Sequence, residues 1–168
     1  MIVLVSDTSV LIDLERGAFL ESAFSLSFEL AVPDLLYQRE LKEHGGKRLL
    51  DLGLKVEDLN GEVTAWAVSF WRQHPTLTLP DCFALALAAD RGWTLLTGDA
   101  GLRDLATAES VDCHGVLWVL DQLLTESIVL PDVLREGLEA IASHPRCRLP
   151  RREINARLER YATLSKKK

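Results

Sequence analysis

The sequence lacks the features that mark secreted, membrane-spanning and disulfide-stabilised proteins. Its three cysteines, Cys82, Cys113 and Cys147, form no close pair and no CxxC motif, so neither a disulfide framework nor a zinc knuckle is predicted. The apolar stretch at residues 83–89 is far shorter than the roughly 20 residues that cross a bilayer. The N-terminus reaches Asp7 without a basic region, which is not the pattern of a signal peptide. We therefore expect a reduced, cytoplasmic protein.

The sequence also lacks the short motifs of several enzyme classes. Neither of the nucleotide-binding glycine patterns, GxGxxG and GxxxxGK[ST], occurs, and there is no GxSxG nucleophile elbow. The four histidines do not have the spacing of metal ligands. Acidic side chains are therefore the strongest candidates for catalysis or metal binding.

The composition is that of a globular protein with an uneven distribution of charge. The 168 residues are 48% hydrophobic and 26% charged, which is enough to bury a core in one domain without cross-links. Residues 1–142 carry 10 Lys and Arg against 23 Asp and Glu, whereas residues 143–168 carry 9 against 2. The acidic body argues against a broad nucleic-acid-binding surface. The basic end is either a solvated helix ending in Lys166–Lys168 or a segment that approaches phosphates or an acidic partner.

Short β-rich runs alternate with helix-like stretches, which predicts a parallel sheet flanked by helices. The expected strands are residues 2–5, 29–32, 54–59 and 93–97, with a short edge strand at 110–113. The expected helices are a first one carrying Val10, Leu11 and Leu14 and ending at Gly17, then 33–44, 47–52, 62–73, 80–91, 101–107, 116–125, 131–143 and 150–164. The fold class predicted is α/β, a three-layer α/β/α sandwich with a four- to five-stranded parallel sheet. We expect one domain over residues 1–125, and a helical extension, 126–168, that packs on it or forms a dimer surface.

Two acidic residues directly follow predicted strands. Asp7 follows the first strand, and Asp99 follows the fourth. Ligands of open parallel sheets bind beyond the carboxyl ends of the strands, where the strand order reverses. Two carboxylates converging there would repel each other unless a cation lay between them.

Two further acids can reach the same edge of the sheet. Glu40 lies on the helix after the second strand, and Asp81 begins the Ala- and Leu-rich helix at 80–91. Clustered oxygen ligands without histidine or thiolate select Mg²⁺ or Mn²⁺, and such ions can activate a water for phosphodiester hydrolysis.

Each acid also has a purely structural interpretation. Asp7 can cap the following helix, and Asp99 lies in a turn-forming Thr-Gly-Asp-Ala-Gly segment. Asp81 is a favourable acid for the first turn of a helix, and Glu40 is one of several acids on an exposed helix face. The functional interpretation depends on the four acids being considered together.

The four acids and their neighbours resemble the motifs of the PIN domain family over residues 1–124. In chain order the motifs are Asp7-Thr8-Ser9, Glu40-Leu41, Leu79-Pro80-Asp81 before Ala84–Ala88, and Leu95-Leu96-Thr97-Gly98-Asp99. PIN domains are metal-dependent ribonucleases with a parallel sheet, and many are VapC-type toxins paired with an antitoxin. The resemblance implies that the catalytic and metal-binding acids are Asp7, Glu40, Asp81 and Asp99. It also implies supporting roles for the hydroxyls of Thr8, Ser9 and Thr97.

The segment after Asp99 departs from the family pattern. Many members carry a further acid two residues after the equivalent of Asp99 and an aromatic residue next to it, where this chain has Gly101 and Leu102. Asp104 lies further along and is a candidate substitute for that acid. The absence of an acid at position 101 concerns a second metal site more than the first. Arg103 is interpreted either as a ligand of a substrate phosphate or as half of a surface salt bridge.

The sequence thus predicts an Mg²⁺- or Mn²⁺-dependent endoribonuclease that acts on single-stranded or looped RNA. The ion would be held by Asp7, Asp81 and Asp99, with Glu40 as a direct or water-mediated ligand. The family resemblance further implies a homodimer and, for a toxin, an antitoxin partner; a housekeeping ribonuclease is the other possibility.

Two other functions compete with the nuclease. A receiver-like phosphoacceptor would need adjacent acids after the first strand and a lysine near the last, whereas Ser6 precedes Asp7 and no lysine follows Lys55 before position 166. A PIN-like interaction module without bound metal is the stronger alternative, since Gly101 replaces an acid. Metal binding discriminates between this module and the nuclease.

Overall fold

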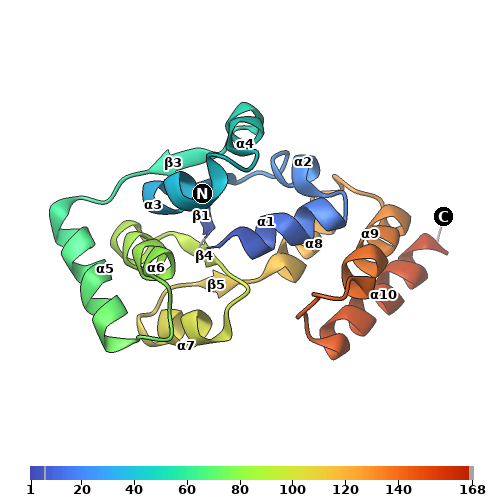
Figure 1. Ribbon diagram of the computed structural model, residues 1–168. Coiled ribbons are helices and arrows are strands. Elements are labelled where there is room, and N and C mark those ends of the chain that lie inside the picture. The colour runs from blue at the N-terminus through green and yellow to red at the C-terminus, as the bar shows by residue number, and fades with distance from the viewer. Residues whose placement is uncertain (6, 167–168) are drawn as a thin grey trace. The chain divides into compact units, whose positions relative to one another are not determined.

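The computed structural model describes residues 1–5 and 7–166 and contains one five-stranded parallel sheet (Figure 1). The strand order is β3-β2-β1-β4-β5. The strands are β1 (Ile2–Val5), β2 (Glu29–Pro33), β3 (Lys55–Glu57), β4 (Thr94–Leu96) and β5 (Cys113–His114). The predicted α/β fold with a parallel sheet of four to five strands is confirmed.

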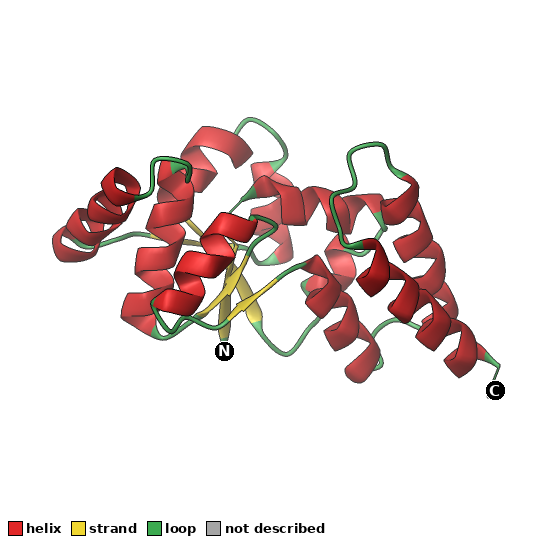
Figure 2. Cartoon of the chain, turned by 90° about the horizontal axis from the view of Figure 1, so that it is seen from below, coloured by secondary structure: helices red, strands yellow, loops and turns green. Residues whose placement is uncertain are grey.

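Helices account for most of the described chain (Figure 2). They are α1 (Thr8–Arg16), α2 (Leu20–Ala23), α3 (Asp34–Leu36), the π-helical turn η1 (Tyr37–Leu41), α4 (Gly46–Leu52), α5 (Gly61–Gln73), α6 (Leu79–Arg91), α7 (Ala100–Ala108), α8 (Val116–Thr125), α9 (Pro131–Ser143) and α10 (Arg151–Ser165). Within the described residues, no helix combines the length and the apolar character that a membrane span requires.

The elements differ from the sequence prediction at three places. The short helix α2 was not predicted. The expected helix at 33–44 is shorter and widens into η1, where the Lys42 amide donates to the Tyr37 carbonyl five residues earlier, at 2.9 Å. The last strand lies at 113–114 instead of 110–113, because Ser110 has a left-handed φ of 58° and still belongs to the turn after α7.

The strand register brings the ends of β1 and β4 together. Val5 is paired with Leu96, so Asp7 and the segment Thr97–Asp99 both follow the end of this strand pair. The chain passes from β1 through β2 to β3 on one side of the sheet, whereas β4 and β5 lie on the other side of β1. The strand order therefore reverses between β1 and β4, which is where ligands bind in open parallel sheets.

The chain forms two compact units that do not follow the order of the sequence. The first unit comprises residues 1–10 and 27–115 and contains the sheet. The second comprises residues 11–26 and 116–168 and is helical in its described part. The domain boundary expected near residue 125 stays a prediction.

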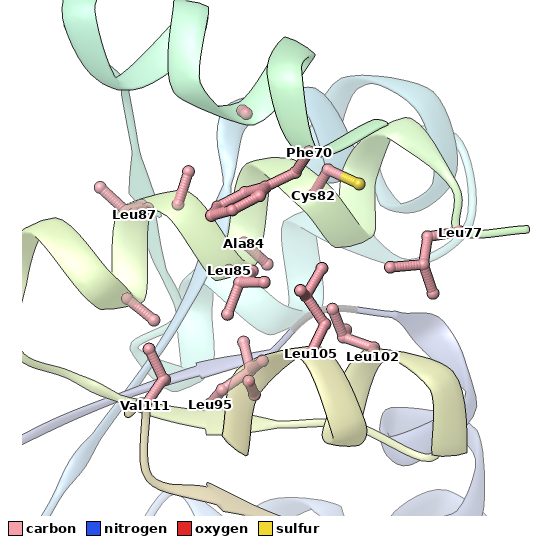
Figure 3. Packing of buried hydrophobic residues seen from close by; sticks show 14 of the residues in the cluster. Phe70, Leu77, Cys82, Ala84, Leu85, Leu87, Leu95, Leu102, Leu105 and Val111 are labelled. Atoms are coloured by element: carbon pink, nitrogen blue, oxygen red, sulfur yellow. The ribbon is translucent and has the colours of Figure 1, made fainter. Parts of the chain in front are cut away.

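The core of the first unit is built around α6. Its residues 84–88 alternate alanine and leucine and are all buried, and the helix contacts β1, β2 and β4. In Figure 3, Phe70 of α5 lies against α6, and Leu102 and Leu105 of α7 approach the same cluster with Leu95 of β4. Since α6 is enclosed by α5, α7 and the sheet, the position of Asp81 in its first turn is fixed by the core.

The second unit depends on close approach between glycines and Phe19. Phe19 is buried, and a Cβ atom built at Gly137 of α9 would lie 2.1 Å from its Cζ atom and 2.5 Å from the Gly17 carbonyl oxygen. Helix α9 packs beside α10, whose Ile154 and Tyr161 are buried (Figure 1). Any side chain at position 137 must therefore displace this packing.

The substitution Gly137→Ala is expected to lower the free energy of unfolding by about 1–3 kcal/mol, because overpacking a closed site forces its neighbours apart. Urea denaturation measures the change. The matched control is Gly61→Ala at the start of α5, where a Cβ atom meets nothing within 4 Å and where the substitution should be neutral or stabilising. Equal stability of the two variants would contradict the packing described.

Candidate active site

The carboxylate of Asp7 joins the ends of β1 and β4. Its Oδ1 atom accepts hydrogen bonds from the Ser9 amide at 2.7 Å and from the Ser9 hydroxyl. Its Oδ2 atom accepts from the Thr97 hydroxyl at 3.2 Å and from the Gly98 amide at 3.4 Å. Two of the predicted supporting hydroxyls, on Ser9 and Thr97, therefore contact Asp7. The bond from the Ser9 amide also caps the start of α1, so the structural role considered for Asp7 is present as well.

Thr97 connects Asp7 to the turn that carries Asp99. The Thr97 side chain is fully buried, and its oxygen accepts a hydrogen bond from the Asp99 amide at 3.1 Å while donating to Asp7. Asp99 is exposed, and its Oδ1 atom accepts from the Leu102 amide at 2.7 Å, which makes Asp99 the N-cap of α7. A single buried hydroxyl thus ties together the two segments that follow β1 and β4.

Asp81 is a buried carboxyl in the first turn of α6, with only 5% of its surface exposed. Its Oδ2 atom accepts from the Thr78 amide at 3.1 Å and from the Thr78 hydroxyl at 2.5 Å, and its own amide donates to the Thr78 oxygen at 3.2 Å. This is a capping box. Thr78 was not among the predicted site residues, although its spacing of three from Asp81 is the sequence signature of this motif.

Burial and, to a smaller extent, the other two aspartates oppose the ionisation of Asp81. Burial raises the pKa of Asp81 above its ordinary value, the hydrogen bonds from Thr78 oppose that rise, and the negative charges of Asp7 and Asp99 add to it. The three carboxylates are therefore close enough to influence one another electrostatically. Such a concentration of like charge is typical of a site that binds a cation.

Glu40 is connected to the same region through Thr8. The Thr8 hydroxyl donates to Glu40 Oε2 at 3.1 Å, and Thr8 follows Asp7 directly in the chain. Glu40 lies on the π-helical turn η1 and is half-buried. Turns of this kind are frequent at functional sites, because the extra residue changes the direction in which the side chains point.

Arg103 lies on α7 beside the end of β4. Its Nη2 atom donates to the Thr97 carbonyl oxygen at 3.4 Å and lies next to Gly115, where a Cβ atom would approach it to 3.4 Å. Within the described residues Arg103 forms no ion pair. The salt bridge considered for Arg103 is therefore absent from the described part of the structure.

Two glycines limit the space around the acids. A Cβ atom at Gly98 would lie 3.0 Å from the Ser9 hydroxyl oxygen, and one at Gly101 would lie 3.3 Å from Asp99 Oδ1. An acidic side chain at position 101 would thus begin in contact with Asp99. Asp104 is exposed on α7 and makes no hydrogen bond to the four acids in the described part of the chain.

The donor set fits a hard cation, but the side chains are not arranged around one. In residues 1–5 and 7–166, no three His, Cys, Asp or Glu side chains are grouped closely enough to hold an ion together. The three aspartates accept hydrogen bonds from Ser9, Thr97, Leu102 and Thr78 instead. All four candidate ligands are carboxylates, which suit Mg²⁺ or Mn²⁺, and a divalent cation would offset the repulsion from Asp7 and Asp99 that adds to the effect of burial on the pKa of Asp81.

Most of the chain matches a known protein family. Residues 3–163 match the family described as DUF3368: PIN domain. The chain belongs to the PIN domain family. The match confirms the resemblance drawn from the motifs and extends beyond residue 124 through most of α10. PIN domains are generally nucleases and generally use divalent metal ions.

Solved structures of other proteins resemble the PIN domain described here only distantly. A PilT N-terminus domain protein from the hyperthermophilic archaeon Sulfolobus solfataricus P2 aligns with a TM-score of 0.48 and 12% identity, over 72% of this chain and 92% of that one. A toxin–antitoxin complex from Klebsiella pneumoniae aligns with a TM-score of 0.41 and 24% identity, over 58% of this chain and 86% of that one. No curated protein matches the sequence.

The substitution Asp81→Asn is expected to stabilise the metal-free protein increasingly as the pH rises. The pKa of Asp81 is raised above 3.8 in the folded protein, so ionisation of this carboxyl opposes folding. The opposition is absent below the unfolded-state pKa and complete above the folded-state pKa. Asparagine retains an acceptor for Thr78 and carries no charge.

Urea denaturation in EDTA at about pH 3.5 and pH 7.5 tests this expectation. The free energy of unfolding of the variant minus that of the native protein should increase between the two pH values. A difference that is constant or decreases would contradict a raised pKa of Asp81 in the folded protein.

Proposed function

We propose that this PIN domain is a metal-dependent endoribonuclease with Asp7, Glu40, Asp81 and Asp99 as its catalytic acids. The observation that supports the proposal best is the junction at the end of β1 and β4. There the buried Thr97 hydroxyl links Asp7 to the Asp99 turn, and both aspartates raise the pKa of the buried Asp81. Family membership supports nuclease chemistry at this position.

The proposed metal site consists of Asp7, Asp81 and Asp99, with Glu40 bound directly or through a water. An Mg²⁺ or Mn²⁺ ion bound there would supply an activated water and would stabilise negative charge on the phosphate oxygens. Asp81 and Asp99 would turn from their capping bonds toward such an ion, and the Ser9 and Thr97 hydroxyls would hold Asp7 in place.

Thr8 and Arg103 have supporting roles in this proposal. Thr8 orients Glu40 by donating to its Oε2 atom. Arg103 is held at the Thr97 carbonyl and forms no ion pair within the described residues, so its remaining donors suit a phosphate oxygen of the substrate.

We propose single-stranded or looped RNA as the substrate because the first unit is acidic. It carries 8 Lys and Arg against 15 Asp and Glu, a net charge of −7. Duplex binding normally requires a much more positive surface, whereas an exposed strand can bend into a small site. Cations in solution would screen the acidic surface as RNA approaches.

Family membership also supports the wider setting of the proposal. We infer a cytoplasmic toxin that forms a homodimer and is held inactive by an antitoxin protein, as for many members of the family. Sedimentation of the purified chain tests the dimer, and a small gene directly upstream would supply the candidate antitoxin.

A PIN-like interaction module without metal is the second candidate. It is favoured by Gly101, which stands in the place of a further acid, and by the capping bonds of Asp81 and Asp99. This module requires no divalent cation, so metal binding separates the two functions.

Calorimetry is expected to show Mn²⁺ binding to the native chain and at least about tenfold weaker binding to Asp7→Asn and Asp99→Asn, because each variant loses one anionic ligand. The same variants should lose RNA cleavage. The control is Glu62→Gln, an exposed acid in the first turn of α5. If the native chain binds no Mn²⁺ at millimolar concentration, the hydrolytic mechanism fails and the interaction module replaces it.

The substitution Arg103→Gln is expected to raise KM for RNA cleavage severalfold and to leave Mn²⁺ affinity unchanged, because the guanidinium contacts phosphate and not the ion. Steady-state cleavage kinetics and calorimetry measure the two effects. Arg72→Gln, at an exposed position on α5, removes the same charge as a control. An unchanged KM would show that Arg103 does not contact the substrate.

A further inference from the structure

A dense group of arginines lies where α9 passes into α10 in the second unit. Arg146, Arg148, Arg151 and Arg152 occur within seven residues, and all four are exposed. No carboxylate of the described residues forms an ion pair with any of them. We call these four residues the arginine cluster.

The backbone that carries the arginine cluster is ordered by its own hydrogen bonds. The Arg146 amide donates to His144 Nδ1 at 3.1 Å, and the Cys147 amide donates to the His144 carbonyl at 2.9 Å. Pro145 and Pro150 restrict the backbone at the two ends of the loop. A ligand would meet a loop that folding has already ordered, so little backbone entropy would be lost on binding.

The position of the cluster is unfavourable for the stability of α10. Arg151 and Arg152 occupy the first two positions of the helix, where the macrodipole favours negative charge. The acid of this turn, Glu153, is paired with Arg157. Charges that oppose local stability and do not contribute to packing are more readily explained by binding than by folding.

Arg157 shows what a structural arginine looks like in the same helix. Its Nη2 atom lies 2.6 Å from Asp121 Oδ2, its Nε atom donates to Asp121 Oδ1 at 3.1 Å, and it also contacts Glu153. Arg157 thereby ties α10 to α8 and is partly buried. The arginine cluster has no equivalent bonds, so the helical packing does not depend on it.

The chemistry of the cluster fits phosphate better than a protein surface. The exposed large hydrophobic side chains of the described residues are Met1, Ile12, Leu50, Trp66, Trp71, Leu130 and Val133. None of them lies in the loop or in the first turn of α10, whereas protein interfaces usually contain apolar anchors. Guanidinium groups bind phosphates with paired hydrogen bonds, and a polynucleotide backbone presents such phosphates at regular intervals.

We propose that the arginine cluster is a docking site for the phosphate backbone of the RNA substrate. This inference rests on the proposed function. It adds the positively charged surface for a phosphate backbone that the acidic first unit lacks. A polynucleotide is a long chain and can contact two surfaces of one protein, so cleavage and backbone binding do not have to share residues. Because the contacts are to phosphate, single-stranded DNA is expected to bind the cluster as well.

Fluorescence anisotropy with a labelled single-stranded RNA of about 20 nucleotides, in EDTA at several salt concentrations, tests the proposal without cleavage. In the cluster variant, all four arginines are changed to glutamine. The control variant makes the same change of charge at four exposed positions of the first unit: Lys42→Gln, Lys47→Gln, Arg72→Gln and Arg91→Gln. Thermal unfolding of each variant is measured in parallel.

The cluster variant is expected to bind RNA at least about tenfold more weakly than the native chain. Its plot of log affinity against log salt should be shallower by about 2–3, because each phosphate contact on a single strand contributes about 0.7 to the slope. The control variant should retain the native slope and most of the affinity. The Tm of the cluster variant should equal or exceed the native value, because unfavourable charges at the start of α10 are removed.

Two results would overturn the proposal. One is that the cluster variant and the control variant bind RNA with the same affinity. The other is cluster-dependent binding of a polyglutamate peptide at least as tight as that of RNA, which would assign the cluster to an acidic protein. Calorimetry with Mn²⁺ distinguishes failure of the docking site from failure of the proposed nuclease function. Cluster-dependent RNA binding without Mn²⁺ binding refutes the nuclease alone, and normal Mn²⁺ binding with cluster-independent RNA binding refutes the docking site alone.

Discussion

The pairing of β1 with β4 is the constraint on which the candidate site depends. Both strands are short, and the register that pairs Val5 with Leu96 places Thr97 where its hydroxyl reaches Asp7. A slip by one residue would turn every side chain of the strand to the opposite face and remove this contact. The register is held by burial of Leu95 and Leu96 and by the packing of α6 against both strands. The hydrophobic core therefore determines the geometry of the acids. Substitutions in the core are expected to alter the site even where the substituted residue does not contact it.

Much of the fold follows from periodicity, and what does not follow depends on contacts distant in sequence. The buried run at 84–88 and the strand endings at Asp7 and Asp99 are visible as patterns, which is why the sheet and the order of the acids could be predicted. The wide turn η1 could not, because a hydrogen bond over five residues leaves no distinct spacing of apolar residues. The grouping of residues 11–26 with the C-terminal helices could not either, since it depends on Phe19 meeting Gly137.

The structural and the functional interpretations of the acids are compatible with each other. Asp7 accepts from the Ser9 amide at the start of α1, Asp99 caps α7 and Asp81 completes a capping box, so three of the four acids have local structural roles. Binding of an ion would replace these capping bonds, so capping does not exclude a role in metal binding. What capping does not explain is the burial of Asp81 beside the charges of Asp7 and Asp99, since a cap functions equally well at the surface.

The distribution of charge along the chain follows from the chemistry proposed for it. A site that binds a divalent cation through carboxylates must be strongly negative before the ion arrives, and the same field repels a polyanionic substrate. Placing more arginines among the acids would pair them with the carboxylates and weaken the metal site. Arg103 avoids this by bonding to the Thr97 carbonyl. Further cations must then lie on other elements. The arginine cluster, in the loop after α9 and the first turn of α10, satisfies that requirement because none of its four residues is paired with a carboxylate of the described residues.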